Sequence, residues 1–363
     1  MTAARTILPG LRRGVVTAPP SKSHRHRVLI ADFLAGGGAY AVPDSGDSDD
    51  VVATKRCLAA LASGDTEPTL DVGESGSTYR FLAPVAAALG RRPCYRTAGR
   101  LASRPQIWYD DLKSGLHMLA GDVSSQFVTG LLFARPVLAG DSEIRFTNPL
   151  QSRGYVDMTL RVLRSYGIVV DETDGGFAIK GRQRFVAPPG EPPTEGDWSG
   201  ATFWLAMNAI GSNVEVKGLD PDSAQPDRMV VGLLSQNGGE KDVSQCPDAF
   251  PALAVVAGAA DGDTRFVGVR RLRLKECDRL AAMAEFLGRL RVEVEEGDDS
   301  FVVHGRGGFA GGASIRTFGD HRIAMSAAVA ATRADGSLKI DDAACSAKSY
   351  PGFFDMFDGL DRN

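Results

Sequence analysis

One unit of local structure recurs along this chain: an amphipathic helix, a glycine, and then short alternating strands. At 157–181 the run MTLRVLRSYG is followed by IVVDE, a Gly-Gly turn and FAIKG, and at 278–305 RLAAMAEFLGRL precedes RVEVEEGDDS and FVVHG. The first part of each unit has the helical period and the second part alternates as a strand does. Asp50 heads a similar helix that is followed by LDVGES, and Asp227 heads a weaker one. Such recurrence predicts a repeat architecture.

The repeat pattern and the chain length together predict the fold class. No G-x-G-x-x-G follows a predicted strand, so a dinucleotide-binding fold is disfavoured, and 363 residues favour two domains. The Pro/Gly-rich stretch 186–197 is predicted as a surface loop, and the boundary is placed near 218–222, where GLDPD ends one half. We expect an α/β (α+β) chain with an N-terminal lobe at 20–220 and a C-terminal lobe of 1–19 plus 221–363.

Composition excludes several classes of function. A net charge of −4 leaves no electrostatic footprint for nucleic acid, and no apolar run is long enough to span a bilayer. The start, MTAARTILPGLRRG, lacks the apolar region of a secretory signal. The five cysteines are scattered, and His24 and His26 lie two apart, on different sides of a helix. We therefore expect a cytoplasmic protein with reduced thiols, no metal, no cofactor, and no nucleic-acid or membrane partner.

Several helix starts in the first half combine small or hydroxyl residues with a cation. A helix N-terminus presents unpaired N–H groups and partial positive charge, and glycines let a ligand approach the backbone. Each such sequence alone is an ordinary helix cap, but so many together favour binding of small anions. They are PPSKSHRHRVL (19–29), GESGSTYRFLAP (73–84), SRP (103–105), GDVSSQFVTGLL (121–132) and SRGYVDM (152–158).

The second half supplies acid–base groups at further helix starts. Asp278 and Asp320 are interpreted as N-caps. Glu276 differs, because a carboxylate flanked by cations can shuttle a proton in a dry site. The segments are CPDAFPALAVVAG (246–258), LRLKECDRL (272–280), FGDHRIAMSAAVA (318–330) and CSAKSYPGFF (345–354).

These motifs, in this order, resemble the 5-enolpyruvylshikimate-3-phosphate synthase family (3-phosphoshikimate 1-carboxyvinyltransferases), one of the enolpyruvyl transferases. The match runs almost end to end, and KECDRL, GDHRIAM and SAKSYP are its most specific parts. The resemblance implies two domains, each an inside-out α/β barrel of repeated helix–strand–strand units. It also implies a monomer that acts on two small molecules, 3-phosphoshikimate and phosphoenolpyruvate, with helix N-termini of both domains facing a cleft that closes.

The resemblance assigns residues to each substrate. Two phosphates and two carboxylates need many cations, which agrees with the arginines and lysines of these motifs. Those implied for 3-phosphoshikimate are Lys22, Ser23, Arg27, Ser124, Ser125, Gln126, Ser152, Tyr155, Asp248, Arg271 and Lys275. Those implied for phosphoenolpyruvate are Lys22, Gly76, Arg104, Gln126, Arg279, Arg322 and Lys348.

The implied mechanism is addition followed by elimination. Asp248 would orient and help deprotonate the 5-hydroxyl, which attacks C2 of phosphoenolpyruvate, while Glu276 would protonate and later deprotonate the methylene carbon. Lys22 and Lys348 would stabilise charge and assist the leaving phosphate. His321 is either a helper of the leaving group or a hydrogen-bonded histidine of the cleft wall.

The chain departs from the family pattern at four places. Glu74 stands where Asn is frequent, and would repel an anion unless it turns away or pairs with a cation. Arg271 stands where an Asn often contacts the shikimate phosphate, and Trp198 and Gly200 alter the EGDxSS pattern. Between Arg104 and Ser124 there is room for one helix but not for the usual strand pair. We expect one trimmed unit in the N-terminal domain, which a complete hairpin between Leu119 and Ser124 would contradict.

Two alternatives remain open at this point. The enolpyruvyl transferase of cell-wall synthesis uses UDP-N-acetylglucosamine and relies on a loop cysteine, which has no counterpart here. A non-catalytic relative, or one specialised for a related substrate, would bind phosphoshikimate without turning it over; Glu74 and the trimmed unit favour it. Sensitivity to glyphosate is open, because Gly76 leaves room for the inhibitor and Glu74 disfavours it.

Overall fold

The computed structural model describes residues 4–41, 44, 46–109, 111–190, 194–236 and 238–362. The chain forms two compact units, which we call the N-terminal unit (Lys22–Thr194) and the C-terminal unit (Met1–Ser21 with Glu195–Asn363). The division falls at 194/195 and not near residue 220. The reason is a long-range pairing: β9 (Asn213–Lys217) lies parallel to β2 (Arg12–Thr17) and belongs to the same sheet.

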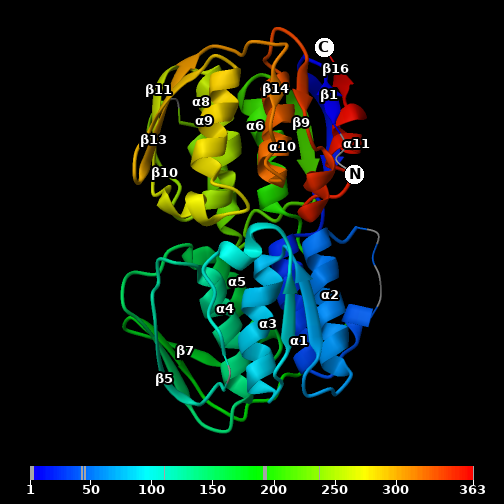
Figure 1. Cartoon of the computed structure of the whole chain (residues 1–363), viewed down its shortest axis with the longest axis vertical. Helices are drawn as coiled ribbons and strands as arrows, with labels where there is room; N and C mark the ends of the chain where they lie inside the picture. The colour runs from blue at the N-terminus through cyan, green and yellow to red at the C-terminus, as the bar shows by residue number, and fades with distance from the viewer. Residues whose placement is uncertain are drawn as a thin grey trace. The chain divides into compact units, whose positions relative to one another are not determined.

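In the C-terminal unit, helices lie between sheets, and Figure 1 shows α8 and α9 beside β10, β11 and β13. Among described residues three sheets have the strand orders β10-β11-β13-β12, β16-β2-β9 and β1-β15-β14. The remaining strands are β1 (Arg5–Ile7), β10 (Gly239–Asp242), β11 (Asp261–Val267), β12 (Glu293–Glu296), β13 (Ser300–Arg306), β14 (Ser314–Ile315), β15 (Leu338–Ile340) and β16 (Asp361–Arg362). The helices are α6 (Trp198–Ala209), α7 (Val230–Leu234), α8 (Phe250–Ala259), α9 (Arg279–Arg289), α10 (His321–Ala331) and α11 (Phe353–Asp358), with the 3₁₀ turns η4 (Pro226–Met229), η5 (Pro247–Ala249), η6 (Arg270–Leu274) and η7 (Ala344–Lys348).

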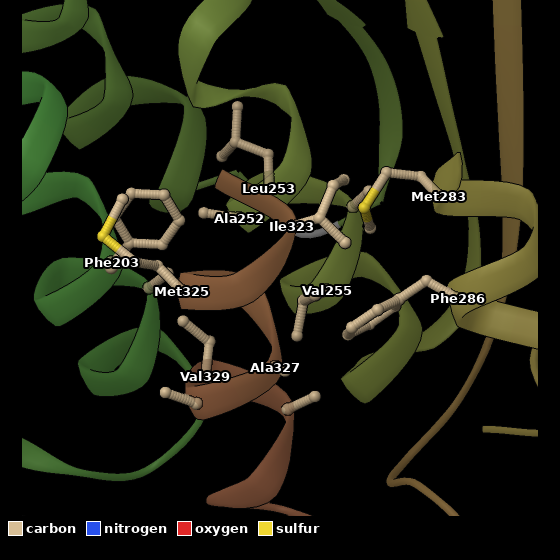
Figure 2. Close-up of a cluster of buried hydrophobic side chains, with 14 of the residues drawn as sticks. Phe203, Ala252, Leu253, Val255, Met283, Phe286, Ile323, Met325, Ala327 and Val329 are labelled. Atoms are coloured by element: carbon tan, nitrogen blue, oxygen red, sulfur yellow. The ribbon is translucent and has the colours of Figure 1, made fainter. Parts of the chain in front are cut away.

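The core of the C-terminal unit is built around α10, all eleven residues of which are buried. Figure 2 shows Ile323, Met325, Ala327 and Val329 of α10 surrounded by side chains of α6, α8 and α9. A helix that is apolar on every side must be enclosed, which explains why the other helices and the sheets cover it. The polar first turn of α10 is thereby held at one end of a rigid core.

The N-terminal unit has the same plan with less sheet. Its helices are α1 (Lys22–Leu34), α2 (Asp49–Ala62), α3 (Gly76–Ala88), α4 (Ser125–Ala134) and α5 (Arg153–Ser165), with the 3₁₀ turns η1 (Ala39–Ala41), η2 (Gly99–Ser103) and η3 (Arg135–Val137). The strands are β3 (Thr69–Gly73), β4 (Cys94–Thr97), β5 (Gly115–Leu119), β6 (Ser142–Phe146), β7 (Val170–Thr173) and β8 (Gly176–Ile179). They form a β3-β4 pair and a β5-β6-β8-β7 sheet in the described part of this unit. Nine of the ten residues of α4 are buried, so α4 is the central helix here.

The two predicted helix–hairpin units are confirmed: α5 is followed by the antiparallel pair β7–β8, and α9 by β12–β13. The segment 105–122 differs from expectation, because its described residues contain the strand β5 and no helix. Residues 119–124 are all described, and no strand lies between Leu119 and Ser124. In the described chain α2 is followed by one strand, β3, and α7 by one strand, β10. These single strands pair with β4 and β11, which come from other segments.

Candidate active site

The N-terminal unit holds a buried ion pair at the first residue of α1. The Lys22 Nζ lies 2.9 Å from Asp50 Oδ2, and both side chains are largely buried. Asp50 is in the first turn of α2, so the pair joins the starts of two helices. The ammonium therefore sits where the helix already carries partial positive charge, and this end of the unit suits an anion.

A second group of cations gathers at the first residue of α3. A Cβ on Gly76 would come within 2.7 Å of Arg80 Nη1 and 3.3 Å of Arg104 Nη1, so both guanidinium groups lie against this glycine. Arg80 Nη1 also donates to Gln126 Oε1 at 2.6 Å, and Gln126 Nε2 donates to Ser77 Oγ at 2.9 Å. The glycine, the two arginines and the glutamine thus meet in one place, as the sequence predicts for three of them.

Arg27 is turned toward the protein. Its guanidinium donates to Thr159 Oγ1 at 2.9 Å, to the Tyr155 carbonyl at 2.8 Å, and to the Ser23 carbonyl at 2.5 Å. Burial lowers the pKa of Arg27 to about 9. The side chain therefore ties α1 to α5 and places Ser23 and Tyr155, two of the residues expected to bind 3-phosphoshikimate, near each other.

The serines expected at the starts of α4 and α5 occupy two different kinds of position. Ser124 caps α4, since its Oγ accepts from the Gln126 N–H at 3.3 Å. Ser152 directly precedes α5, is buried, and has a φ of 54°, a left-handed conformation that is uncommon for serine. Such strain is frequent at functional positions, which singles out Ser152.

The Glu74 carboxylate lies against the backbone of η2, at Gly99. A Cβ on Gly99 would come within 2.2 Å of Glu74 Oε1, and the φ of Gly99 is 55°. Only glycine satisfies both conditions. The carboxylate is thus held against Gly99.

The C-terminal unit concentrates its charges around Asp248, in η5. This carboxylate accepts from Arg279 Nη1 at 2.7 Å, from Arg322 Nη2 at 3.0 Å, and from Lys275 Nζ at 3.1 Å. Burial by itself would raise the pKa of Asp248, but the three cations outweigh burial and hold that pKa well below its usual value. Asp248 therefore stays ionised through the neutral range.

Arg279 is the centre of the same cluster, and its side chain is 1% exposed. Its three guanidinium nitrogens meet three carboxylates: Nε donates to Asp320 Oδ2 at 2.7 Å, Nη1 to Asp248, and Nη2 to Glu276 Oε2 at 2.8 Å. Burial opposes its charge, but the carboxylates prevail and raise the pKa of Arg279. Glu276 is thereby fixed beside a permanent cation.

Asp320 orders the start of α10. Its Oδ1 accepts from the Arg322 N–H at 2.9 Å, which confirms the predicted N-cap, while the same carboxylate holds Arg279. His321 is buried, with Nδ1 3.7 Å from Asp320 Oδ1. The cap at Asp278 is confirmed too, because its Oδ1 accepts from the N–H groups of Leu280 and Ala281 at the start of α9.

Two further expected cations lie in the C-terminal unit. Arg271 Nη2 donates to the Ser244 carbonyl at 2.6 Å, and the Arg271 charge is near enough to contribute to the lowered pKa of Lys275, for which burial is the larger cause. Lys348 ends η7, which packs against α10, and is buried. Arg271 therefore lies near Lys275 of the Asp248 cluster, and Lys348 lies in a turn that packs against α10.

Sequence reasoning named three further residues of these clusters but assigned them no role at the site. Asp50 is predicted only to head a helix, and Arg80 only belongs to the segment 73–84, although it stands four residues after Gly76 and so shares its helix face. Asp320 was interpreted as a cap alone, because its contact with Arg279 joins residues 41 positions apart. Long-range ion pairs of this kind leave no local sequence signal.

A cavity of about 250 Å³ lies elsewhere in the C-terminal unit, among α6, α8 and β10. Its buried cation, Lys241, donates to the carbonyls of Leu233 and Gln236 at the end of α7. A lysine there offsets the negative end of the helix dipole, so its role is structural.

The chain is similar to known proteins over almost its whole length. The sequence model of a family described as EPSP synthase (3-phosphoshikimate 1-carboxyvinyltransferase) matches residues 103–357. A 3-phosphoshikimate 1-carboxyvinyltransferase from Clostridium kluyveri is 37% identical, covering 98% of this chain and 96% of the relative. Another, from Clostridioides difficile, is 34% identical, with 97% and 96% covered. The first alignment spans 415 positions against 363 residues here, so that relative has residues with no counterpart in this chain.

Solved structures share the fold. An EPSP synthase from Acinetobacter baumannii has a TM-score of 0.76 at 22% identity, with 99% of this chain and 98% of the other covered. The enolpyruvyl transferase NikO from Streptomyces tendae has a TM-score of 0.73 at 15% identity, with 99% and 97% covered. The similarity therefore extends over both units.

Proposed function

The chain belongs to the EPSP synthase (3-phosphoshikimate 1-carboxyvinyltransferase) family, and from that premise we propose which of its residues bind the substrates and move the protons. The activity is transfer of the enolpyruvyl group of phosphoenolpyruvate to the 5-hydroxyl of 3-phosphoshikimate, with release of phosphate. It is a step of the shikimate pathway toward chorismate and the aromatic amino acids. The observation that carries our assignment is the cluster of Asp248, Glu276 and Arg279 with its further cations.

We assign phosphoenolpyruvate to the cations whose guanidinium or ammonium groups gather at helix starts. In the N-terminal unit these are Lys22 and, beside Gly76 and Gln126, Arg104. Arginine forks match carboxylate and phosphate oxygens in pairs, which supports these roles. The residues of the C-terminal unit assigned to phosphoenolpyruvate are Arg279, Arg322 and Lys348.

We assign 3-phosphoshikimate to the hydroxyl-rich starts of α1, α4 and α5 and to the rim of the Asp248 cluster. Arg27 joins α1 to α5 through Ser23 and Tyr155, which supports their common role. Ser152 adds a strained, buried hydroxyl. The remaining residues of this set are Ser124, Ser125, Gln126, Lys22, Asp248, Arg271 and Lys275.

In the proposed mechanism Asp248, ionised because three cations surround it, orients the 5-hydroxyl toward C2 of phosphoenolpyruvate. Asp248 takes the hydroxyl proton as the O–C2 bond forms, and this proton later goes to the departing phosphate. Glu276 delivers a proton to the methylene carbon, which gives a tetrahedral adduct with a methyl group. Glu276 then takes back a proton from that methyl as phosphate leaves. Lys22 and Lys348 stabilise the charge on the departing phosphate, and His321 is assigned to assist it.

We also propose that the protein works as a cytoplasmic monomer without a cofactor and that each unit is an inside-out α/β barrel, with one repeat trimmed in the N-terminal unit. The lack of a strand between the described residues Leu119 and Ser124, and 415 aligned positions against 363 residues, support the trimming. In the described ranges no helix is long and apolar enough to cross a membrane.

The test is a phosphate-release assay in deuterated water. Release must require both substrates, and residual phosphoenolpyruvate must gain deuterium at its methylene carbon, because addition converts that carbon to a methyl. Phosphoshikimate binding without release would instead identify a non-catalytic relative. Release with a close analogue but not with phosphoshikimate would identify a specialised enzyme; Glu74 is the residue that favours that alternative.

A further inference from the structure

A chain of buried polar side chains joins the first three helices of the N-terminal unit. His26 on α1 places Nδ1 2.7 Å from Thr54 Oγ1 on α2, and Thr54 Oγ1 lies 2.7 Å from Thr78 Oγ1 on α3. All three side chains are fully buried. Buried polar groups that are satisfied by one another rigidify the elements they join.

The contacts of Thr78 show where this network ends. Thr78 Oγ1 lies 3.2 Å from the Asp50 carbonyl, which can only accept, and 2.8 Å from Ser75 Oγ. Burial lowers the pKa of His26 to about 3, so the imidazole is neutral and has one donor and one acceptor nitrogen. His26 Nδ1 therefore forms one hydrogen bond with Thr54 Oγ1, as donor or as acceptor according to the tautomer.

Both ends of this series of hydrogen bonds contact groups that the proposed function uses. The Asp50 carboxylate receives Lys22 Nζ at 2.9 Å, so fixing the Asp50 backbone also fixes the partner of Lys22. At the other helix, the Thr78 N–H donates to Ser75 Oγ at 3.2 Å, which caps α3 directly before Gly76. His26 therefore reaches Lys22 and Gly76 without lying beside either of their expected ligands.

We propose that His26 is a positioning residue for phosphoenolpyruvate, acting through Thr54 and Thr78 on Lys22 and on the start of α3. The inference rests on the proposed function, in which Lys22 and Gly76 contact that substrate. It predicts a larger effect on phosphoenolpyruvate than on 3-phosphoshikimate, because Gly76 is assigned to the first substrate alone.

Packing offers a competing role, since the His26 ring also meets Phe81 edge-on at 6.1 Å. Two substitutions separate packing from hydrogen bonding. His26→Leu keeps an apolar body and removes the hydrogen-bonding nitrogen, whereas His26→Asn restores an amide, which can donate or accept, near the place of Nδ1. Thr54→Val breaks the next link with little change of shape.

Tyr79→Phe provides the matched control. Tyr79 follows Thr78 on α3 and is buried, and its hydroxyl has no hydrogen-bond partner in the described part of the chain. Removing that hydroxyl therefore changes the same helix without cutting the chain of hydrogen bonds.

The experiment measures kcat and KM for both substrates in each variant, together with the thermal midpoint. For His26→Leu and Thr54→Val we expect the KM for phosphoenolpyruvate to rise about tenfold, the equivalent of one buried hydrogen bond. The KM for 3-phosphoshikimate should rise at most about threefold, since Lys22 alone is shared. His26→Asn should recover most of the loss, and Tyr79→Phe should match the wild type.

The outcomes are distinguishable. A wild-type chain that releases no phosphate with both substrates overturns the proposed function and, with it, this inference. An active wild type in which His26→Leu and Thr54→Val behave like Tyr79→Phe overturns the inference alone. So does an equal rise of both KM values that merely follows a lower thermal midpoint and is not recovered by His26→Asn.

Discussion

At the scale of single residues, Glu276 is the side chain on which the proposed proton transfers depend. Glu276→Gln keeps the length and one acceptor for Arg279 but removes the carboxylate. We expect kcat to fall by about 10²- to 10⁴-fold, the usual contribution of a general acid–base group. The dissociation constant of 3-phosphoshikimate, measured by calorimetry, should change less than about twofold.

The control for this variant is Glu285→Gln on α9, the helix that follows Glu276, where the carboxylate pairs with Arg289 and Arg316 near the surface. It should leave kcat unaltered. Near-normal turnover by Glu276→Gln would remove Glu276 from the mechanism.

Arg279 tests whether the fork geometry matters beyond charge. A lysine has one nitrogen and cannot reach Asp320, Asp248 and Glu276 at once. For Arg279→Lys we expect kcat/KM for phosphoenolpyruvate to fall about 100-fold, equal to about 2.7 kcal/mol of transition-state stabilisation. Steady-state kinetics of Arg279→Lys are compared with those of Arg289→Lys, at the exposed end of α9. Equal kcat/KM values for the two variants would show that any cation suffices.

The depressed pKa of Asp248 has a consequence for stability against pH. The folded protein keeps this carboxylate ionised where the unfolded chain, with a pKa of about 3.9, protonates. Its contribution is therefore complete above about pH 4 and is lost as the pH falls through the lower, folded-state pKa. For Asp248→Asn, which leaves three cations around an amide, we expect a thermal midpoint lower by roughly 5–10 °C at pH 7.

The gap between Asp248→Asn and the wild type should narrow as the pH drops below about 4. Thermal melts from pH 3 to pH 7 measure it, with Asp174→Asn, in the exposed turn between β7 and β8, as the control. A gap that stays constant over this range would contradict the assigned pKa direction.

At the scale of elements, α3 and α4 approach each other closely at Gly130. Pro84 has no N–H to give to the Arg80 carbonyl four residues earlier, and a Cβ on Gly130 would come within 2.2 Å of that carbonyl oxygen. Gly130→Ala should therefore force the helices apart and lower the free energy of unfolding by about 1–3 kcal/mol.

Gly288→Ala in α9 is the matched control, because no atom lies within 4 Å of its added Cβ. There the substitution should stabilise, by about 0.5–1 kcal/mol, since alanine favours helix. Urea unfolding of both variants measures the sign of each change in the free energy of unfolding. Stabilisation by Gly130→Ala would show that α3 and α4 can move apart at little cost.

The elements show what sequence patterns can and cannot predict. The hairpins after α5 and α9 were predictable because their helical and alternating periods are local. The strand β5 was not, because its apolar Leu116 and Met118 are exposed and the segment lacks the usual buried alternation. The boundary at 194/195 was missed for another reason: β9 pairs with β2, about 200 residues earlier, and only the folded chain brings them together.

The candidate site also has features that the sequence predicts and features that only the folded chain shows. Motifs and helix caps predicted Asp248, Glu276 and Lys22. Other predicted site residues also stand at helix starts, which local sequence patterns indicate. The contacts by which Asp50 and Asp320 hold Lys22 and Arg279 in place could not be predicted, because they join separate helices. Sequence thus predicts which groups carry charge, whereas the fold decides which groups orient them.

At the scale of the whole molecule, the two units differ in the number of chain segments that form them. The N-terminal unit is one continuous segment with its own core, whereas the C-terminal unit needs residues 1–21 as well. The strand β2 is the middle strand of β16-β2-β9, so its removal leaves both neighbours unpaired. We expect a fragment of residues 22–194 to fold alone and one of residues 195–363 to fail.

Circular dichroism and thermal melts of the fragments measure this. Residues 1–21 joined through a linker to the end of the 195–363 fragment are the control and should restore a cooperative transition. Cooperative unfolding of 195–363 by itself would show that β2 is dispensable.

Because the C-terminal unit is formed by two separate segments of the chain, its parts are synthesised at different times. The first strands leave the exit tunnel long before β9, which follows about 200 residues later, or roughly 10–40 s at ordinary rates of translation. During that time the continuous unit can mature, while β2 travels as an unpaired strand with Val16 uncovered. We therefore expect chaperones to bind the segment that carries β2, and this segment to promote aggregation when chaperones are scarce.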